Sequence, residues 1–310
     1  MAVSLRNNAM AALPAGARGG PDIVVGIGFA ALTFFCATLM DATLKWLSAG
    51  YPLHQIIFFN ALFALGPIAV FIATHGGRNA IATRRPWLHV ARGGISVIGA
   101  YGGIYAFSLL PMTDVYAIFF AAPILITALS VPLLGERVGW RRWSAVLAGF
   151  IGVIIMLRPA DDFMNVGTVA ALIAMTAFSL SVILVRRYGA KEPVASFSVS
   201  QMLPLALWFG LLTAFDFVPP TMADLSLSAI GGTLGGLASL LMVQAVRRAP
   251  AAVVAPFQYS QMIWGTLIGW LLWQDLPDEW ILIGGGLVIA SGLYILHRET
   301  ILGLKRRKAA

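Results

Sequence analysis

The chain has 310 residues, of which 59% are hydrophobic and 11% are charged. Soluble domains carry about 25% charged residues, so a soluble fold would leave most of these apolar side chains in contact with water. This composition excludes a soluble protein and indicates an all-α, polytopic membrane protein. Roughly ten spans of about 20 residues would use two thirds of the chain, which leaves short loops and no room for a soluble catalytic domain.

Few residues offer enzymatic or cofactor chemistry. The single cysteine, Cys36, lies within an apolar run and excludes a disulfide within the chain. The four histidines are scattered over different segments, and no phosphate-binding loop is present. We therefore expect no enzyme activity, no metal, no cofactor and no ATP-driven step. The net charge of +8 is explained by membrane topology, so no nucleic-acid partner is expected.

Ten apolar runs follow one another along the chain, and each is long enough to cross a bilayer as a helix. We predict spans at residues 23–49, 52–73, 88–110, 112–134, 138–157, 166–185, 194–215, 225–246, 251–273 and 280–296. Residues 1–21 are predicted to form a cytoplasmic N-terminal tail, and residues 300–310 a basic cytoplasmic tail. The sequence thus predicts ten transmembrane helices.

The spans divide into two related halves. Pro111 and Glu136 are 25 positions apart in the first half, and Pro250 and Asp275 are 25 positions apart in the second. Weaker matches continue upstream, such as Gly93 with Gly232. Five spans in each half is an odd number, so the second half must enter the membrane from the opposite side. We predict an inverted repeat, with repeats at residues 22–160 and 161–299.

The distribution of cations predicts the orientation. With the N-terminus inside, 18 of the 21 Lys and Arg residues fall in inner segments, and Arg158 is the one cation in an outer loop. The remaining two, Lys45 and Arg92, lie within predicted spans. Cytoplasmic loops carry an excess of Lys and Arg, so both termini are predicted to be cytoplasmic, in a multi-pass protein of the inner membrane.

Polar and aromatic side chains gather in the third, fourth, eighth and ninth spans. Tyr101 and Tyr105 are four apart and share a helix face. Buried amides and phenols need partners from other helices or from a wet cavity. The alternative is pure helix packing, which the glycines of the third and eighth spans also suggest. The predicted substrate-binding residues are Tyr101, Tyr105, Phe119, Gln244, Gln258, Tyr259, Gln261 and Trp264.

Asp41, Lys45 and Arg92 are ionisable residues inside predicted spans, where charge is costly and commonly functional. Asp41 and Lys45 are spaced for an i,i+4 pair near the outer end of the first span. Arg92 lies in the inner third of the third span, where it could reach the interface or bind a carboxylate. These three are candidates for coupling or gating, although mutual neutralisation and contact with the interface would explain them without a function.

One group of motifs resembles a known family. Leu110-Pro111, Ala121-Ala122-Pro123, the LGER stretch at 134–137, the GFIGV stretch at 149–153 and Arg158-Pro159 look like the repeat unit of the drug/metabolite transporter superfamily. The match is to the ten-helix branch, whose unit is called EamA. The resemblance implies a five-plus-five inverted fold around a central cavity. It also implies transport of small metabolites, and helices three and nine look similar to those of aromatic amino acid exporters.

Together these observations predict an exporter of amino acids, aromatic and other neutral ones included, and of related small metabolites, by alternating access. The lipid bilayer and the substrate are the expected partners, and the protein is expected to be a monomer or a homodimer. Efflux of cationic or aromatic drugs is the alternative within transport, since it would use a cavity carboxylate and cation–π contacts. A membrane-embedded receptor or enzyme is the alternative from another class.

Overall fold

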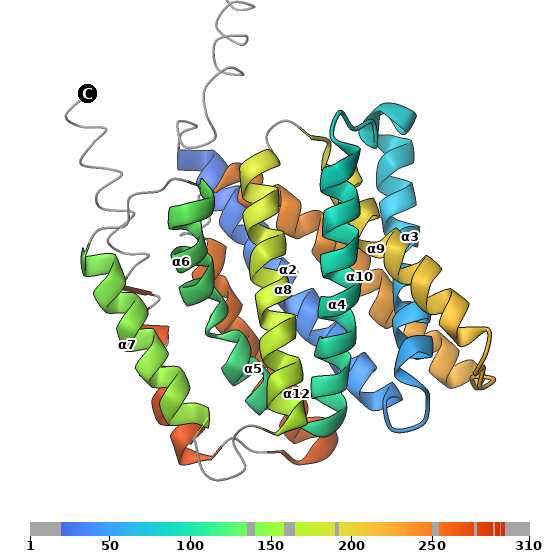
Figure 1. Cartoon of the computed structure of the whole chain (residues 1–310). Helices are drawn as coiled ribbons and strands as arrows, with labels where there is room; N and C mark the ends of the chain where they lie inside the picture. Colours follow the sequence, from blue (N-terminus) through green and yellow to red (C-terminus); the bar gives the residue numbers. More distant parts are fainter. Residues whose placement is uncertain are drawn as a thin grey trace, which may run out of the picture.

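The computed structural model describes residues 20–134, 140–157, 165–189, 192–249, 254–275, 278–287, 289–291 and 293–294. Residues 1–19, Glu136, Arg158, the acidic loop that follows it and the C-terminal tail lie outside this part of the chain. All regular secondary structure in the described residues is helical. Its α-helices are α2 (Gly20–Leu47), α3 (Leu53–Thr74), α4 (Pro86–Leu109), α5 (Met112–Phe119), α6 (Ala122–Leu134), α7 (Trp140–Leu157), α8 (Val166–Tyr188), α9 (Val194–Thr213), α10 (Met222–Arg248) and α12 (Ser260–Trp273), shown in Figure 1. The described residues also form two 3₁₀ turns, η2 (Gly77–Ala80) and η3 (Ala255–Tyr259), and a short apolar helix at Glu279–Ser291.

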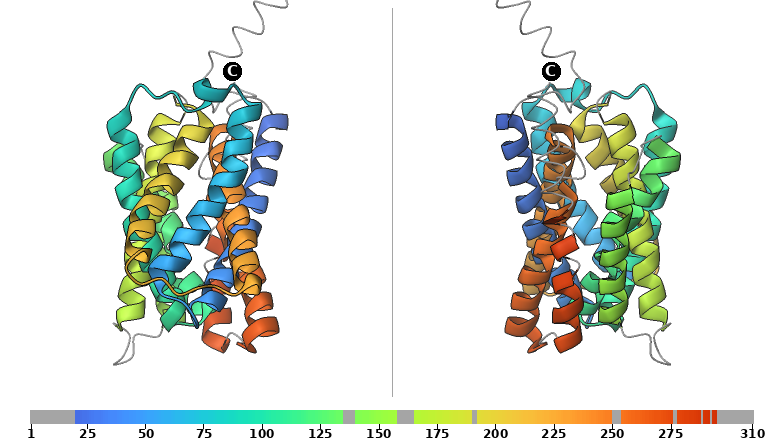
Figure 2. Two further views of the ribbon diagram at one scale, coloured as in Figure 1. Left: turned by 90° about the vertical axis from the view of Figure 1, so that its right-hand side faces the viewer. Right: turned by 90° about the vertical axis from the view of Figure 1, so that its left-hand side faces the viewer.

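The helices run roughly along one common axis and form a bundle (Figure 2). Six helical stretches, of which Asp114–Leu134 runs through α5 and α6, are long and apolar enough to cross a bilayer: Val24–Leu47, Leu53–Thr74, Asp114–Leu134, Val166–Tyr188, Val194–Thr213 and Met222–Arg248. Large hydrophobic side chains such as Val90, Leu207 and Phe215 are exposed on the outside of the bundle. So much exposed apolar surface is unfavourable in water and is expected in contact with lipid, so the prediction of an all-helical membrane protein is confirmed.

Small residues allow the helices to pack closely. α4 packs against α8 and α9, while α10 packs against α2 and α3. A Cβ added at Gly99 would lie 2.9 Å from Ala177 Cβ on α8, and one added at Gly232 would lie 2.6 Å from Asn60 O on α3. Only glycine fits at such distances, so these residues fix how near the neighbouring backbones come.

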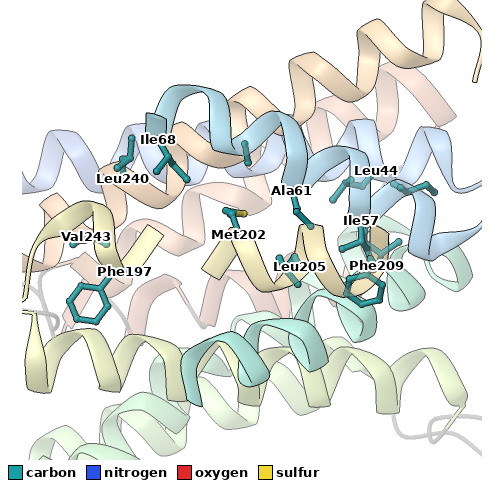
Figure 3. Packing of buried hydrophobic residues seen from close by; sticks show 14 of the residues in the cluster. Leu44, Ile57, Ala61, Ile68, Phe197, Met202, Leu205, Phe209, Leu240 and Val243 are labelled. Atoms are coloured by element: carbon teal, nitrogen blue, oxygen red, sulfur yellow. The ribbon is translucent and has the colours of Figure 1, made fainter. Parts of the chain in front are cut away.

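The largest apolar core lies between α3, α9 and α10. Phe197, Phe209, Ile68 and Val243 are fully buried there, and Figure 3 shows these side chains filling the space between the helices. Sheets are absent from the described residues, so helix-on-helix packing of this kind holds the bundle together. It also fixes the faces of α4, α9 and α10 that border the interior.

The predicted fourth span is not one continuous helix. It is split into α5 and α6 at Phe120 and Ala121, and Pro123 is the second residue of α6. Proline has no N–H, so it cannot donate to the carbonyl four residues earlier, that of Phe119. The ninth span is likewise interrupted, because η3 precedes α12 there. Phe120 and Tyr259, at the two interruptions, pack edge to face with ring centroids 5.4 Å apart.

Candidate functional site

A cavity of about 300 Å³ lies inside the bundle, bordered by α2, α3, α4, α5, α8, α9, α10, η3 and α12. This volume is at the lower end of the range for small-molecule sites. Its wall is mostly apolar and aromatic. Six longer polar side chains also reach it: Asp41, Asn60, Arg92, Gln201, Gln258 and Gln261.

The first end of the cavity is formed around Arg92, whose side chain is 4% exposed. Its Nη2 donates to Gln201 Oε1 at 2.8 Å, and its guanidinium lies 5.4 Å from the centre of the Phe197 ring. Ser239 Oγ donates to the same Gln201 oxygen at 3.1 Å. Gln201 is thereby held in place from two helices, and it orients the guanidinium.

The second end is formed around Asp41. Tyr116 Oη donates to Asp41 Oδ2 at 3.0 Å, and the buried Tyr116 ring packs on Phe107 of α4 with centroids 5.7 Å apart. Phe107 and Arg92 are 15 positions apart on α4, which is about 22 Å along the helix axis. The Asp41–Tyr116 pair therefore lies near one end of the α4 wall and Arg92 near the other, and no ion pair joins Asp41 to Arg92 in the described residues.

The segment η3, which precedes α12, contributes the amide of Gln258 to the cavity wall. Gln258 Nε2 donates to Phe119 O at 3.1 Å, and Gln258 is 2% exposed. This is the carbonyl that Pro123 leaves without a backbone donor, so the side chain of one interrupted span satisfies the backbone of the other. Both Phe119 and Gln258 line the cavity.

Five of the residues predicted from sequence line this cavity: Asp41, Arg92, Phe119, Gln258 and Gln261. Tyr101 does not, because it is nine positions from Arg92 and so about 180° around the helix. Its ring is 46% exposed on the outer face of α4, where it stacks on Tyr105 and Phe209 at 6.1 and 6.2 Å. Tyr105 follows it on that face and is also outside the lining.

The other predicted residues make packing contacts outside the cavity. Trp264 packs on Phe35 at 5.0 Å, Tyr259 packs on Phe120, and the Gln244 side chain accepts a hydrogen bond from Arg248. Lys45 does not pair with Asp41 as its spacing predicted. Its Nζ lies 3.6 Å from Asp275 Oδ2 and 5.1 Å from the centre of the Trp273 ring, because the end of α2 is adjacent to the end of α12.

Sequence reasoning did not assign a site role to Asn60, Gln201 or Ser239, which all line the cavity. A signal was present, since Asn60 and Gln201 are amides within apolar runs and match each other when the two halves are aligned. A buried amide in an apolar helix needs a partner, so this match could have indicated an interior polar surface.

A helical bundle with exposed apolar flanks and an interior cavity that several polar side chains reach is the architecture of a membrane transporter of small molecules. The chain belongs to the EamA-like transporter family, whose model matches residues 24–158 and again residues 165–296. This confirms the family resemblance read from the LGER and GFIGV stretches.

Relatives within the family carry different substrates. An S-adenosylmethionine uptake transporter of Rickettsia bellii is 27% identical over 276 residues, which cover 89% of this chain and 94% of that protein. A riboflavin transporter of Rhizobium johnstonii is 28% identical over 281 residues, covering 89% and 92%. A pseudopaline exporter of Pseudomonas aeruginosa is 24% identical over 273 residues, covering 86% and 94%. A solved crystal structure superposes with a TM-score of 0.64 at 21% identity, covering 91% of this chain and 99% of the other, which shows a shared fold.

Proposed function

We propose that this transporter exports small zwitterionic metabolites, amino acids, aromatic ones included, and related compounds, by alternating access through the central cavity. The observation that carries the proposal is that one cavity holds both a carboxylate, Asp41, and a guanidinium, Arg92. Neither has an ionic partner within 4.0 Å in the described part of the chain. A substrate with groups of both signs would compensate both charges, while the aromatic wall suits an apolar or aromatic side chain.

The proposed architecture is ten membrane helices in two inverted repeats, at residues 22–160 and 161–299. The pattern of helix contacts supports it. α4 packs on α8 and α9, and the matching helix of the second half, α10, packs on α2 and α3. The double match of the family model supports two copies of one unit. The cation distribution supports a cytoplasmic position for both termini in a protein of the inner membrane.

The substrates named for the relatives are compatible with a zwitterionic substrate for this chain, but they do not identify it. S-adenosylmethionine, the substrate in the name of the Rickettsia relatives, contains an α-amino acid group and a second positive charge. Riboflavin, in the name of the Rhizobium relative, lacks an amino acid group. The family therefore accommodates several substrates, and the charges within this chain's own cavity are the better guide to its substrate.

The test is transport by purified protein in liposomes. We expect labelled phenylalanine, tyrosine and neutral aliphatic amino acids to cross, with each competing against the others. Absence of flux for every amino acid, together with flux of a quaternary amine, would favour drug efflux. This second candidate is favoured by Asp41, which lies in a cavity whose wall also holds the aromatic rings of Tyr116, Phe119 and Phe107. Ligand binding without any flux would indicate a receptor.

A further inference from the structure

Arg92 is a buried cation with unused hydrogen-bond donors. Of its three guanidinium nitrogens, Nη2 bonds to Gln201, whereas Nε and Nη1 are buried and have no partner among the described residues. Arginine remains charged in proteins, so the residue cannot avoid the cost of burial by losing its proton. A guanidinium in this state is incompletely compensated within the protein.

The acidic groups around Arg92 do not supply that compensation. Glu192, on the segment that precedes α9, is buried and directed to His89, with His89 Nε2 and Glu192 Oε2 3.5 Å apart. Asp41 is bonded to Tyr116 at the other end of the cavity. The other groups around Arg92 are uncharged: the amide oxygen of Gln201, the hydroxyl of Ser239 that bonds to this oxygen, and the ring face of Phe197. The missing partner is therefore an anion that enters through the cavity that Arg92 lines.

We propose that Arg92, oriented by Gln201, is the subsite that binds the carboxylate of the transported molecule. The inference rests on the proposed function and adds an orientation to it. Guanidinium recognises carboxylate through charge-assisted hydrogen bonds, and the Gln201–Ser239 contact fixes the donor group before the ligand arrives. With the carboxylate on Arg92, the rest of the bound molecule points along the cavity towards Asp41 and Tyr116.

The first experiment compares three ligands of one shape. Phenylalanine has both charged groups, 3-phenylpropionate has only the carboxylate, and phenylalaninamide has only the ammonium. We expect the purified wild-type protein to bind the first two and to bind the amide at least about 30-fold more weakly. Arg92→Gln should weaken phenylalanine binding by at least about 30-fold and abolish the preference over the amide. Arg92→Lys keeps the charge and should retain part of this preference.

The second experiment separates binding from structure. Arg84→Gln is the matched control, because Arg84 is exposed and precedes the same helix; it should leave all three affinities unchanged. Without ligand, Arg92→Gln should melt at the wild-type temperature or above it, since it removes a buried charge without an ionic partner. A lower melting temperature with unchanged ligand preference would assign Arg92 a structural role and overturn the subsite.

The outcomes distinguish this inference from the proposed function. If wild-type protein transports phenylalanine but binds the amide equally well, the carboxylate subsite is wrong and the function stands. If 3-phenylpropionate binds in a way that depends on Arg92 but no amino acid crosses, the function is wrong and the subsite stands. Binding of none of the three ligands overturns both.

Discussion

Gln258 donates a hydrogen bond from Nε2 to the backbone oxygen of Phe119 at 3.1 Å, across 139 positions of sequence. The acceptor is free because Pro123 lacks the N–H that a continuous helix would supply there. Through this bond the interruption in one half of the chain is stabilised by the interrupted segment of the other. In membrane transporters, interrupted helices commonly border the substrate site, and here the two segments border the interior cavity.

This bond predicts a non-additive pair of substitutions. Gln258→Ala should lower the free energy of unfolding by about 1–3 kcal/mol, because a buried carbonyl loses its donor. In a Pro123→Ala background residue 123 can donate to Phe119 O itself, so the same change should cost much less. Thermal or denaturant unfolding in detergent of the two single variants and the double variant measures the coupling. Equal costs in both backgrounds would show that the bond does not stabilise the interruption.

The glycines of α4 provide a comparison between neighbours. A Cβ at Gly93 would lie 2.7 Å from Pro204 Cγ and 3.3 Å from Ser200 O on α9, while a Cβ at Gly94 would meet nothing within 4 Å. Gly93→Ala should therefore destabilise the protein by about 1–3 kcal/mol through overpacking. Gly94→Ala should be neutral or slightly stabilising, since alanine favours a helix. Melting temperatures of the two variants check this, and similar values would contradict the close α4–α9 contact.

The contacts of Lys45 predict unequal effects at the two ends of one ion pair. Asp275→Asn removes a partly exposed pair, which is worth about 0.2–1 kcal/mol. Lys45→Met also loses the contact with Leu110 O at 3.4 Å and the cation–π contact with Trp273, so it should cost more. Adding Asp275→Asn to Lys45→Met should have little further effect. Unfolding measurements at low and high salt would detect this order, and a larger effect for Asp275→Asn would contradict it.

The orientation can be tested with reporter fusions. A fusion at Lys308 should report the cytoplasm, and one within residues 161–165 should report the periplasm, because 18 of the 21 cations fall in segments assigned to the inside. The matched control is a fusion within residues 74–85, which carry three arginines and should again report the cytoplasm. The reverse pattern would contradict the proposed topology.

The sequence predicts the helices of this protein better than it predicts the cavity. Apolar runs and their boundaries are local properties, and each predicted span up to residue 273 has a helix or a pair of helical segments in the structure. The face of a helix that borders a cavity depends on its neighbours. Tyr101 and Tyr105 share a face as expected, but α8 and α9 position α4 so that Arg92 faces the interior, Tyr101 faces outward and Tyr105 is partly buried outside the cavity lining. Similarly, the i,i+4 spacing of Asp41 and Lys45 does not reveal that Asp275 lies nearer to Lys45.

The difference between these two faces gives the last prediction. Gln261 is 6% exposed and lines the cavity, whereas Tyr101 is 46% exposed and lies outside the lining. Gln261→Ala should reduce amino acid flux per folded molecule at least several-fold, because the cavity loses an amide that can bond to the substrate's polar groups. Tyr101→Ala should keep wild-type flux, with at most a small loss of stability from its stacking on Phe209. Flux is measured in liposomes and normalised to the amount of monodisperse protein. If Tyr101→Ala abolished transport while Gln261→Ala did not, the substrate would bind along the outer face of α4 and the interior cavity would not be the transport site.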